Sequence, residues 1–187
     1  MRNRRKPCGI LRVQAPTMET ETPALPRIVL TIGFPGSGKS TWLSDRGITP
    51  LSSDALRKLL LDDEDNQTEN RSIFMVLRQL LRKRLQLKRP VTYVDATHLT
   101  AWERQPYFHL AKLHGCDVEA LWFDEPFEVC LERNAARPRV VPLDVMHRMR
   151  QRFQPPTLRE GFSRIVVLRE GAVRTIPPEG EHRQPDR

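Results

Sequence analysis

Short apolar runs and helix-like patterns alternate along this chain. The runs at 28–32, 91–95, 118–123 and 165–168 are rich in β-branched or aromatic residues and are nearly continuous in apolar character. Runs of this kind are typical of central strands that are buried on both faces of a parallel sheet. Residues 72–87 instead repeat their apolar positions with the spacing of one helix face. The chain therefore predicts strands and helices in turn.

The helix expected at 72–87 leaves Arg78, Arg82 and Lys83 outside its apolar stripe. A charged face on an amphipathic helix usually faces water. We interpret these three residues as a solvated face and not as a binding surface.

Turn and cap signals place the remaining helices. A capping box begins at Thr100 and Gly115 suits the end of that helix, while Pro106 either kinks it or moves its start. Further helices are expected near 126–136 and 142–153, each opened by a proline. The alternation predicts an α/β fold, a doubly wound parallel sheet of about five strands flanked by helices, with its ligand at the carboxyl ends of the strands.

The composition fits one domain. The chain has 187 residues, 39% of them hydrophobic, which is enough for one buried core. It has neither a run of about 20 uncharged apolar residues nor the apolar part of a signal peptide, so we expect a cytoplasmic protein without a membrane segment. Cys8, Cys116 and Cys130 are scattered and odd in number, which indicates neither a disulfide framework nor a zinc site.

The charge and the prolines set the expected domain limits. The formal net charge is +8, and much of the excess lies in a basic, proline-containing segment at 1–26 that we expect to be a disordered tail. This tail either touches nucleic acid or is a plain solvated extension. We assign the catalytic-sized domain to 27–169 and a C-terminal tail to 170–187.

A phosphate-binding motif follows the first expected strand. Residues 33–40 match the pattern G-x-x-x-x-G-K-[ST] of a P-loop, so the expected fold is that of a P-loop NTPase. Residues without a Cβ allow successive backbone amides to surround phosphate oxygens. Lys39 would reach the β- and γ-phosphates of ATP, and Ser40 would bind Mg²⁺. The expected nucleotide-binding residues are Gly33, Pro35, Gly36, Ser37, Gly38, Lys39, Ser40 and Thr41.

Two polar residues follow the strand expected at 91–95. Asp95 ends that strand in the Walker-B form and is a second candidate ligand for Mg²⁺. His98 has no second histidine or cysteine at metal-ligand spacing, so we interpret it as a polar contact near the acceptor substrate.

A second acidic candidate is Asp54, where a short strand through Ile48 and Leu51 is expected to meet a helix. One interpretation is an ordinary helix cap. The other is a general base that accepts the proton of an attacking hydroxyl, with Arg57 holding an anionic group of the acceptor.

Arg133 and Arg137 are four residues apart and would share a helix face. They are either surface arginines at a helix end or catalytic residues of a helical lid, at about 133–153, that neutralise the moving phosphoryl group.

Together these segments resemble the kinase module of bacterial end-healing polynucleotide kinase-phosphatases and, more distantly, the bacteriophage polynucleotide 5'-kinase. The resemblance runs from about residue 27 to 168. It rests on G-x-P-G-S-G-K-S-T at 33–41, S-S-D-x-x-R at 52–57, D-D-E-D-N-Q-T at 62–68, V-D-A-T at 94–97, E-R-N-x-x-R at 132–137 and R-E-G-F at 159–162.

The resemblance implies a role for each matching residue. Lys39 and Ser40 would bind phosphate and Mg²⁺, Asp54 would be the general base toward a 5'-hydroxyl, and Arg57 would contact a backbone phosphate of the acceptor. Arg133 and Arg137 would match the lid arginines that clamp phosphate. The family often has Asn where this chain has His98, and this chain has no room for the linked phosphatase and nucleotidyltransferase domains, so phosphatase and ligase partners would act in trans.

The leading hypothesis is an ATP-dependent polynucleotide 5'-hydroxyl kinase that acts on DNA or RNA ends in nucleic-acid repair. A small-metabolite kinase on the same fold and a regulatory ATP-binding module are the alternatives. The sequence leaves open the choice between DNA and RNA, the triphosphate donor and the oligomeric state, a homodimer being one option.

Overall fold

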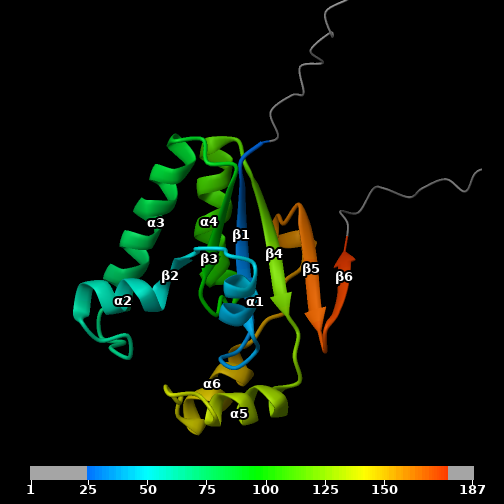
Figure 1. Cartoon of the computed structure of the whole chain (residues 1–187). Coiled ribbons are helices and arrows are strands. Elements are labelled where there is room, and N and C mark those ends of the chain that lie inside the picture. Colours follow the sequence, from blue (N-terminus) through cyan, green and yellow to red (C-terminus); the bar gives the residue numbers. More distant parts are fainter. Residues whose placement is uncertain (1–24, 177–187) are drawn as a thin grey trace, which may run out of the picture.

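A six-stranded sheet forms the centre of the fold (Figure 1). The computed structural model describes residues 25–176. The strand order across the sheet is β2-β3-β1-β4-β5-β6. The strands are β1 (Arg27–Ile32), β2 (Leu51–Ser52), β3 (Val91–Asp95), β4 (Asp117–Phe123), β5 (Arg164–Arg169) and β6 (Ala172–Ile176).

Strand β1 lies at the middle of the sheet and pairs in parallel with β3 and with β4. Arg27 aligns with Val91 on one side and with Asp117 on the other. All β1 residues after Arg27 are buried, as a strand covered on both faces requires. The four strands predicted from apolar runs are confirmed, and the mostly parallel, helix-flanked sheet is the predicted fold class.

The sheet extends further than the sequence indicated. Strand β6 pairs antiparallel with β5 and lies inside the segment that we assigned to a C-terminal tail. The sheet has six strands instead of about five, and its last strand escaped detection because only its final residue is even partly buried. Strand β2 is also shorter than expected, since Ile48 lies outside it.

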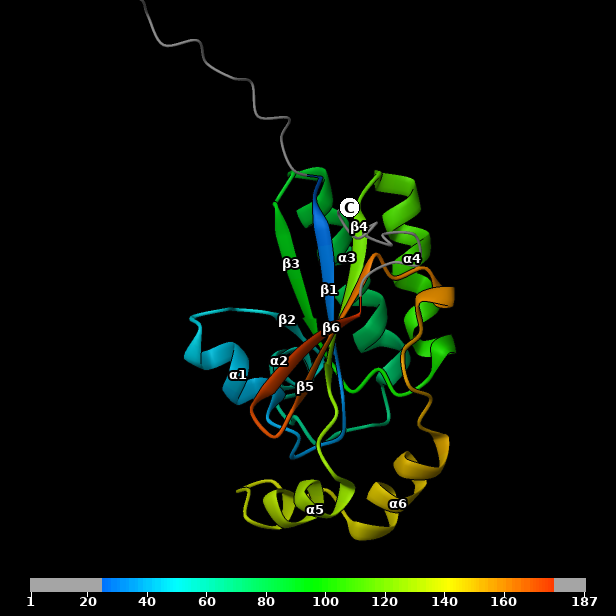
Figure 2. The ribbon, with the colours of Figure 1, turned by 90° about the vertical axis from the view of Figure 1, so that its right-hand side faces the viewer.

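The helices are α1 (Lys39–Asp45), α2 (Ser53–Leu61), α3 (Asn70–Gln86), α4 (Ala101–His114), α5 (Phe127–Ala135) and α6 (Leu143–Arg152), with a short 3-10 helix at Leu158–Glu160. Helices α3 and α4 cover one face of the sheet, and α1 lies on the other (Figure 2). Helices α5 and α6 lie beyond the carboxyl ends of the parallel strands (Figure 1). Between residues 25 and 176, none of the helices is both long enough and apolar enough to cross a bilayer.

The main core lies between the sheet and the pair α3 and α4. Helix α3 buries Ile73, Leu77, Leu81 and Leu85 at every fourth position, and Tyr107 of α4 joins the same cluster. Each fully buried side chain of this size contributes about 1.5 to 3 kcal/mol to folding. The apolar face read from the sequence is therefore the face that holds α3 on the sheet.

Helix α4 has the predicted ends. The side chain of Thr100 accepts a hydrogen bond from the backbone of Glu103, whose own side chain completes the capping box. Gly115 ends the helix with a φ of 59°. Pro106 stays inside the helix, and the helix begins at Ala101, so the proline does not move its start.

A second, smaller core joins the phosphate-binding loop to the two helices beyond the sheet. It contains Phe34, Leu99, Phe127, Cys130 and Met146. Both α5 and α6 begin directly after a proline, as expected, although each proline takes the cap position and not the first helical turn. The predicted lid at 133–153 comprises the end of α5, a connecting loop and α6. Residues 1–24 and 177–187, including most of both predicted tails, lie outside the described residues.

Candidate active site

The loop between β1 and α1 has the tight geometry that its glycines permit. Gly36 has a φ of 81°, and a Cβ there would lie 2.4 Å from the carbonyl oxygen of Cys130. Helix α5 thus packs directly on the loop backbone, and a side chain at this position is excluded. Gly38 has a φ of 92° but open space around it, so its glycine is needed for the backbone conformation alone.

Lys39 is the first residue of α1, and its side chain folds back into the loop. Its Nζ donates hydrogen bonds to the carbonyl oxygens of Gly33 at 2.9 Å and Phe34 at 2.7 Å, and to Ser37 Oγ at 3.2 Å. Burial lowers the pKa of Lys39 to about 8, although Asp95 opposes that shift. An ammonium desolvated in this way gains strongly from a phosphate anion placed beside it.

Asp95 stands at the end of β3, next to the central strand. Its Oδ1 accepts a hydrogen bond of 2.9 Å from the hydroxyl of Thr31 in β1. Burial raises the pKa of Asp95, and the nearby Lys39 ammonium acts in the opposite direction. The carboxylate is thus fixed beside the P-loop. Ser40, in the first turn of α1, lies exposed on the same cleft.

The hydroxyl of Ser40 and the carboxylate of Asp95 are oxygen ligands of the kind that Mg²⁺ in Mg·ATP prefers. No group of three His, Cys, Asp or Glu side chains gathers at a point within residues 25–176. Mg²⁺ is usually held by one or two protein ligands and by substrate phosphates, so Ser40 and Asp95 suit it without a full side-chain cage.

Asp54 lies in the first turn of α2 between two arginines. Its Oδ1 accepts a hydrogen bond of 2.6 Å from Arg57, and its Oδ2 accepts one of 2.9 Å from Arg139. Arg57 is buried, and its second terminal nitrogen donates to the side chain of Asn70 at 2.6 Å. Ser52 caps α2, so Asp54 is not the N-cap residue. The carboxylate is held in place while remaining half exposed to the cleft.

The lid arginines lie in different surroundings. Arg133, on α5, pairs with Glu125 at 3.3 Å. Arg137 lies beyond the end of α5, so the expectation that Arg133 and Arg137 share a helix face is wrong. The helix ends at Ala135, and Pro138, which cannot continue a helix, follows two residues after the cap residue Ala136. Arg137 lines the cleft, and its charge helps to lower the pKa of Lys39.

Arg139, Asn70 and Asn134 are site residues that the sequence analysis did not assign. Arg139 joins Asp54 to Asp65 in the connection between α2 and α3. Asn134 is buried, and its amide both donates to the carbonyl of Val141 at 2.8 Å and accepts from the Val141 amide at 3.1 Å. The repeated arginines at 133, 137 and 139 were the available signal for Arg139. Asn134 stands in the E-R-N-x-x-R motif, but only the structure shows that its amide holds the loop at Val141. No local signal indicated Asn70, because its partner Arg57 lies on another helix.

His98 lies in the inner wall of the cleft. It is only 2% exposed, and its Nδ1 lies 2.8 Å from the Thr31 carbonyl oxygen, to which a neutral ring donates. Its ring meets Tyr107 edge to face at 5.1 Å. Burial lowers the pKa of His98 to about 4, so the ring is neutral near pH 7. The ring thus packs at the strand ends, and its predicted contact with the acceptor stays a prediction.

One cleft of about 2000 Å³ brings these groups together. Its lining includes the P-loop, Asp54, Arg57, Asp95, Arg133, Arg137 and Arg139. Ordinary small-molecule pockets occupy about 300 to 1000 Å³. The cleft therefore has room for a nucleotide and for a sizeable second substrate.

A family described as AAA domain matches residues 28–156 of the chain. Among solved structures, the chain is similar to a chain of the Pnkp1/Rnl/Hen1 RNA repair complex, with a TM-score of 0.60 and 18% identity over 71% of this chain and 45% of that one. This chain thus spans less than half of that relative.

Two small-molecule kinases show similar likeness. The APS kinase CysC of Mycobacterium tuberculosis, solved with AMPPNP and APS, has a TM-score of 0.51 and 20% identity over 80% of this chain and 91% of that one. A gluconokinase from Sinorhizobium meliloti has a TM-score of 0.51 and 20% identity over 78% and 83% of the two chains. At these identities the likeness shows the fold, which is the nucleotide-binding P-loop kinase fold that the sequence predicted.

Proposed function

The chain belongs to the AAA domain family, and from that premise we propose that it is an ATP-dependent polynucleotide 5'-hydroxyl kinase. It would transfer the γ-phosphate of ATP to the 5'-hydroxyl end of DNA or RNA, as a step in nucleic-acid repair. The observation that carries the proposal is the position of Asp54, held between Arg57 and Arg139 on the same cleft as the P-loop.

The P-loop side prepares the donor. Lys39 and the loop amides would hold the phosphates, with Ser40 and Asp95 as the residues for Mg²⁺. Bound Mg·ATP supplies the phosphoryl group and neutralises part of its charge. Arg137 and Arg133 lie at the cleft from the lid side, where additional positive charge stabilises charge that spreads over the moving group.

Asp54 is suited to accept the proton of the acceptor hydroxyl. Each of its oxygens makes one hydrogen bond to an arginine, and a carboxylate oxygen has two acceptor sites. A hydroxyl can therefore bind Asp54 without breaking either arginine contact. The two ion pairs orient the carboxylate, and positioning is a large part of catalysis in phosphoryl transfer.

The neighbourhood of Asp54 favours an anionic polymer as acceptor. Arg57 lies beside the catalytic carboxylate and suits the first backbone phosphate after the 5' end. Arg71 and Phe74 continue the cleft lining along α3. Charge and an aromatic ring next to each other are usual where proteins bind single strands. The likeness to the RNA repair complex supports this acceptor, and partners that remove phosphates or join ends would act in trans.

The small-metabolite kinase is the second candidate. The likeness to the APS kinase and the gluconokinase covers most of their length as well as most of this chain. Arg71 and Phe74 line the cleft beyond Asp54, which favours a polymer over a sugar acid.

The test is phosphate transfer from γ-labelled Mg·ATP to a panel of acceptors. The panel contains a 5'-hydroxyl DNA strand, the same RNA strand, gluconate and APS, with Lys39→Ala as the inactive control. Label on strand ends that Lys39→Ala abolishes supports the proposal and ranks DNA against RNA. Label on gluconate or APS and none on either strand would show that the protein is a metabolite kinase.

A further inference from the structure

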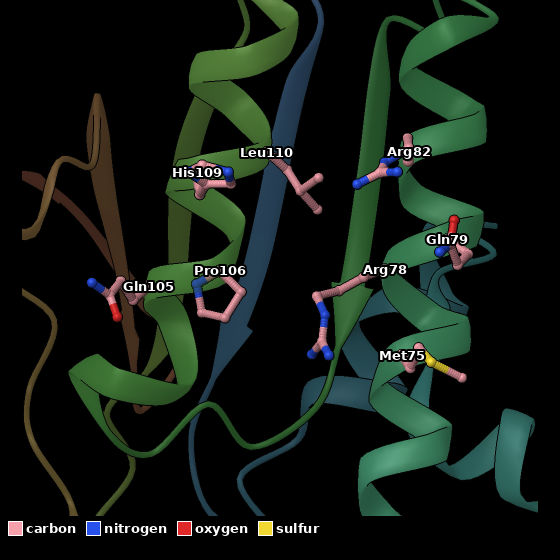
Figure 3. Close-up of a pocket in the computed structure, with 8 residues that line it drawn as sticks. All are labelled: Met75, Arg78, Gln79, Arg82, Gln105, Pro106, His109 and Leu110. Atoms are coloured by element: carbon pink, nitrogen blue, oxygen red, sulfur yellow. The ribbon is translucent and has the colours of Figure 1, made fainter.

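A groove of about 420 Å³ lies between α3 and α4, on the helix-covered face of the molecule (Figure 3). It is lined by Met75, Arg78, Gln79, Arg82, Gln105, Pro106, His109 and Leu110. The residues assigned so far to phosphate transfer lie elsewhere. The function proposed above therefore does not account for this groove.

The groove is basic. Arg78 and Arg82 extend from α3 toward α4, and His109 lies on the opposite helix (Figure 3). None of the residues that line the groove is acidic. Within residues 25–176, no carboxylate forms an ion pair with either guanidinium. By contrast, Arg57, Arg104 and Arg139 are each paired with an acid.

The groove continues the candidate active-site cleft. Arg78 and Pro106 line both. Along α3, the residues Asn70, Phe74, Arg78 and Arg82 follow one another at steps of four, which places them in one row on the helix. Asn70 begins the row at the side chain of Arg57, beside Asp54. The row thus leads from the proposed site of transfer to the groove.

We propose that this groove binds the sugar-phosphate backbone of a single-stranded nucleic acid, several nucleotides beyond the 5' end. The proposal rests on the proposed function and assigns the path of its acceptor. Arg78 and Arg82 contact successive phosphates, and Phe74 offers a ring on which a base stacks. The strand leaves the cleft past Arg57 and runs along α3.

A polymer explains the arrangement better than a small anion. Sites for small phosphates usually gather backbone amides and side chains around one point, whereas here two guanidiniums lie one helical turn apart on α3. The groove also shares Arg78 and Pro106 with the cleft, which a separate effector site would not require. The sequence pattern alone favoured a solvated face for these arginines because it could not show that α4 forms the opposite wall.

The test compares strands of two lengths by direct binding. A 3'-labelled strand of about 12 nucleotides and one of about three are titrated with the wild type and with Arg78→Gln/Arg82→Gln at several salt concentrations. Lys83→Gln/Lys112→Gln is the matched control, because it removes two exposed charges from the same two helices outside the groove. Arg78→Lys/Arg82→Lys restores the charge, and thermal unfolding checks that each variant folds.

The double glutamine variant is expected to bind the long strand on the order of tenfold more weakly at about 0.1 M salt, with a salt slope reduced by about 0.7 for each phosphate that the protein no longer neutralises. The short strand keeps its affinity, and transfer to the long strand is lost through KM more than through kcat. The lysine variant recovers most of the affinity, and the control variant resembles the wild type.

Two results overturn the inference and leave the proposed function intact. In one, the wild type phosphorylates strands but the double glutamine variant binds the long strand as well as the wild type. In the other, long and short strands lose affinity equally, which places the arginines at a small-anion site or in the cleft. If the wild type neither binds nor phosphorylates any strand, the proposed function and the groove fail together.

Discussion

The two sides of the cleft are stabilised in different ways. On the side of the P-loop, the Lys39 ammonium is buried, contacts loop carbonyls within six residues in sequence, and rests on a loop against which α5 packs. On the side of Asp54, the carboxylate is half exposed and is held by Arg57 from its own helix and by Arg139, 85 residues away. Backbone packing holds the first side, and two ion pairs, one within α2 and one to the distant Arg139, hold the second.

Substitutions on the two sides should therefore change different quantities: the free energy of unfolding on the P-loop side and the rate of phosphate transfer on the Asp54 side. Changes on the P-loop side disturb a close-packed backbone, so they cost folding free energy. Changes at Asp54 and Arg139 disturb ion pairs on a half-exposed carboxylate, of which the pair to Arg139 contributes little to folding. They act on the orientation of a catalytic group, where small displacements are costly.

The largest effect is expected for Asp54→Asn. Loss of the proton acceptor should lower kcat by about 10² to 10⁴, while affinity for ATP changes little. Single-turnover transfer to a 5'-hydroxyl strand and a separate nucleotide-binding titration measure the two quantities.

Asp65→Asn is the matched control for that variant, because Asp65 also contacts Arg139 but not Arg57. It should keep kcat within about tenfold of the wild type. Equal losses in the two variants would mean that Asp54 acts only through Arg139 and is not the base.

The next largest effect concerns His98, which lies behind both sides of the cleft. Its folded-state pKa of about 4 is below its ordinary value of 6.5. The unfolded chain therefore binds a proton first as the pH falls. Stability contributed by the neutral ring is complete above about pH 6.5 and decreases by about 1.4 kcal/mol for each pH unit between there and about pH 4.

The measurement is urea unfolding at several pH values for the wild type and His98→Asn. Asparagine tolerates the left-handed backbone at this position, where φ is 46°, and its amide can replace the donor to the Thr31 carbonyl. Stability of the variant should fall less steeply below pH 6.5. A wild-type slope retained in His98→Asn would refute this assignment.

The P-loop side of the cleft was predictable from the sequence, whereas the contacts on the Asp54 side were not. The P-loop, the four main strands and the capping box of α4 were predictable because their signals lie within a few consecutive residues. The Asp54 and Arg139 pair was not, since it joins segments that only the fold brings together. Strand β6 escaped for another reason: an exposed edge strand has no buried face to produce an apolar pattern.

A smaller effect is expected for Gly36→Ala, which tests the packing of the P-loop side. The added Cβ meets the Cys130 carbonyl, and the backbone is already in the left-handed region. Unfolding free energy without nucleotide should fall by about 1 to 3 kcal/mol. Gly38→Ala adds a Cβ in open space with a similar φ, so it should lose only the backbone strain of about 1 to 2 kcal/mol. If Gly38→Ala proves the more destabilising, contact with α5 is not what constrains the loop.

The smallest effect is expected for Arg139→Ala, which should lower the rate of phosphate transfer and leave the stability of the fold nearly unchanged. The acids that it contacts are 48% and 65% exposed, so its removal should change the unfolding free energy by less than about 1 kcal/mol. Asp54 nevertheless loses one of the two arginines that orient its carboxylate. The kcat/KM for a strand acceptor should therefore drop by about three- to tenfold, which corresponds to about 1 kcal/mol of transition-state stabilisation. Arg148→Ala removes a similar exposed ion pair within α6 and should leave transfer unchanged. If Arg139→Ala instead lowers stability and leaves turnover intact, the contact serves to close the lid loop, and Arg57 alone orients the carboxylate.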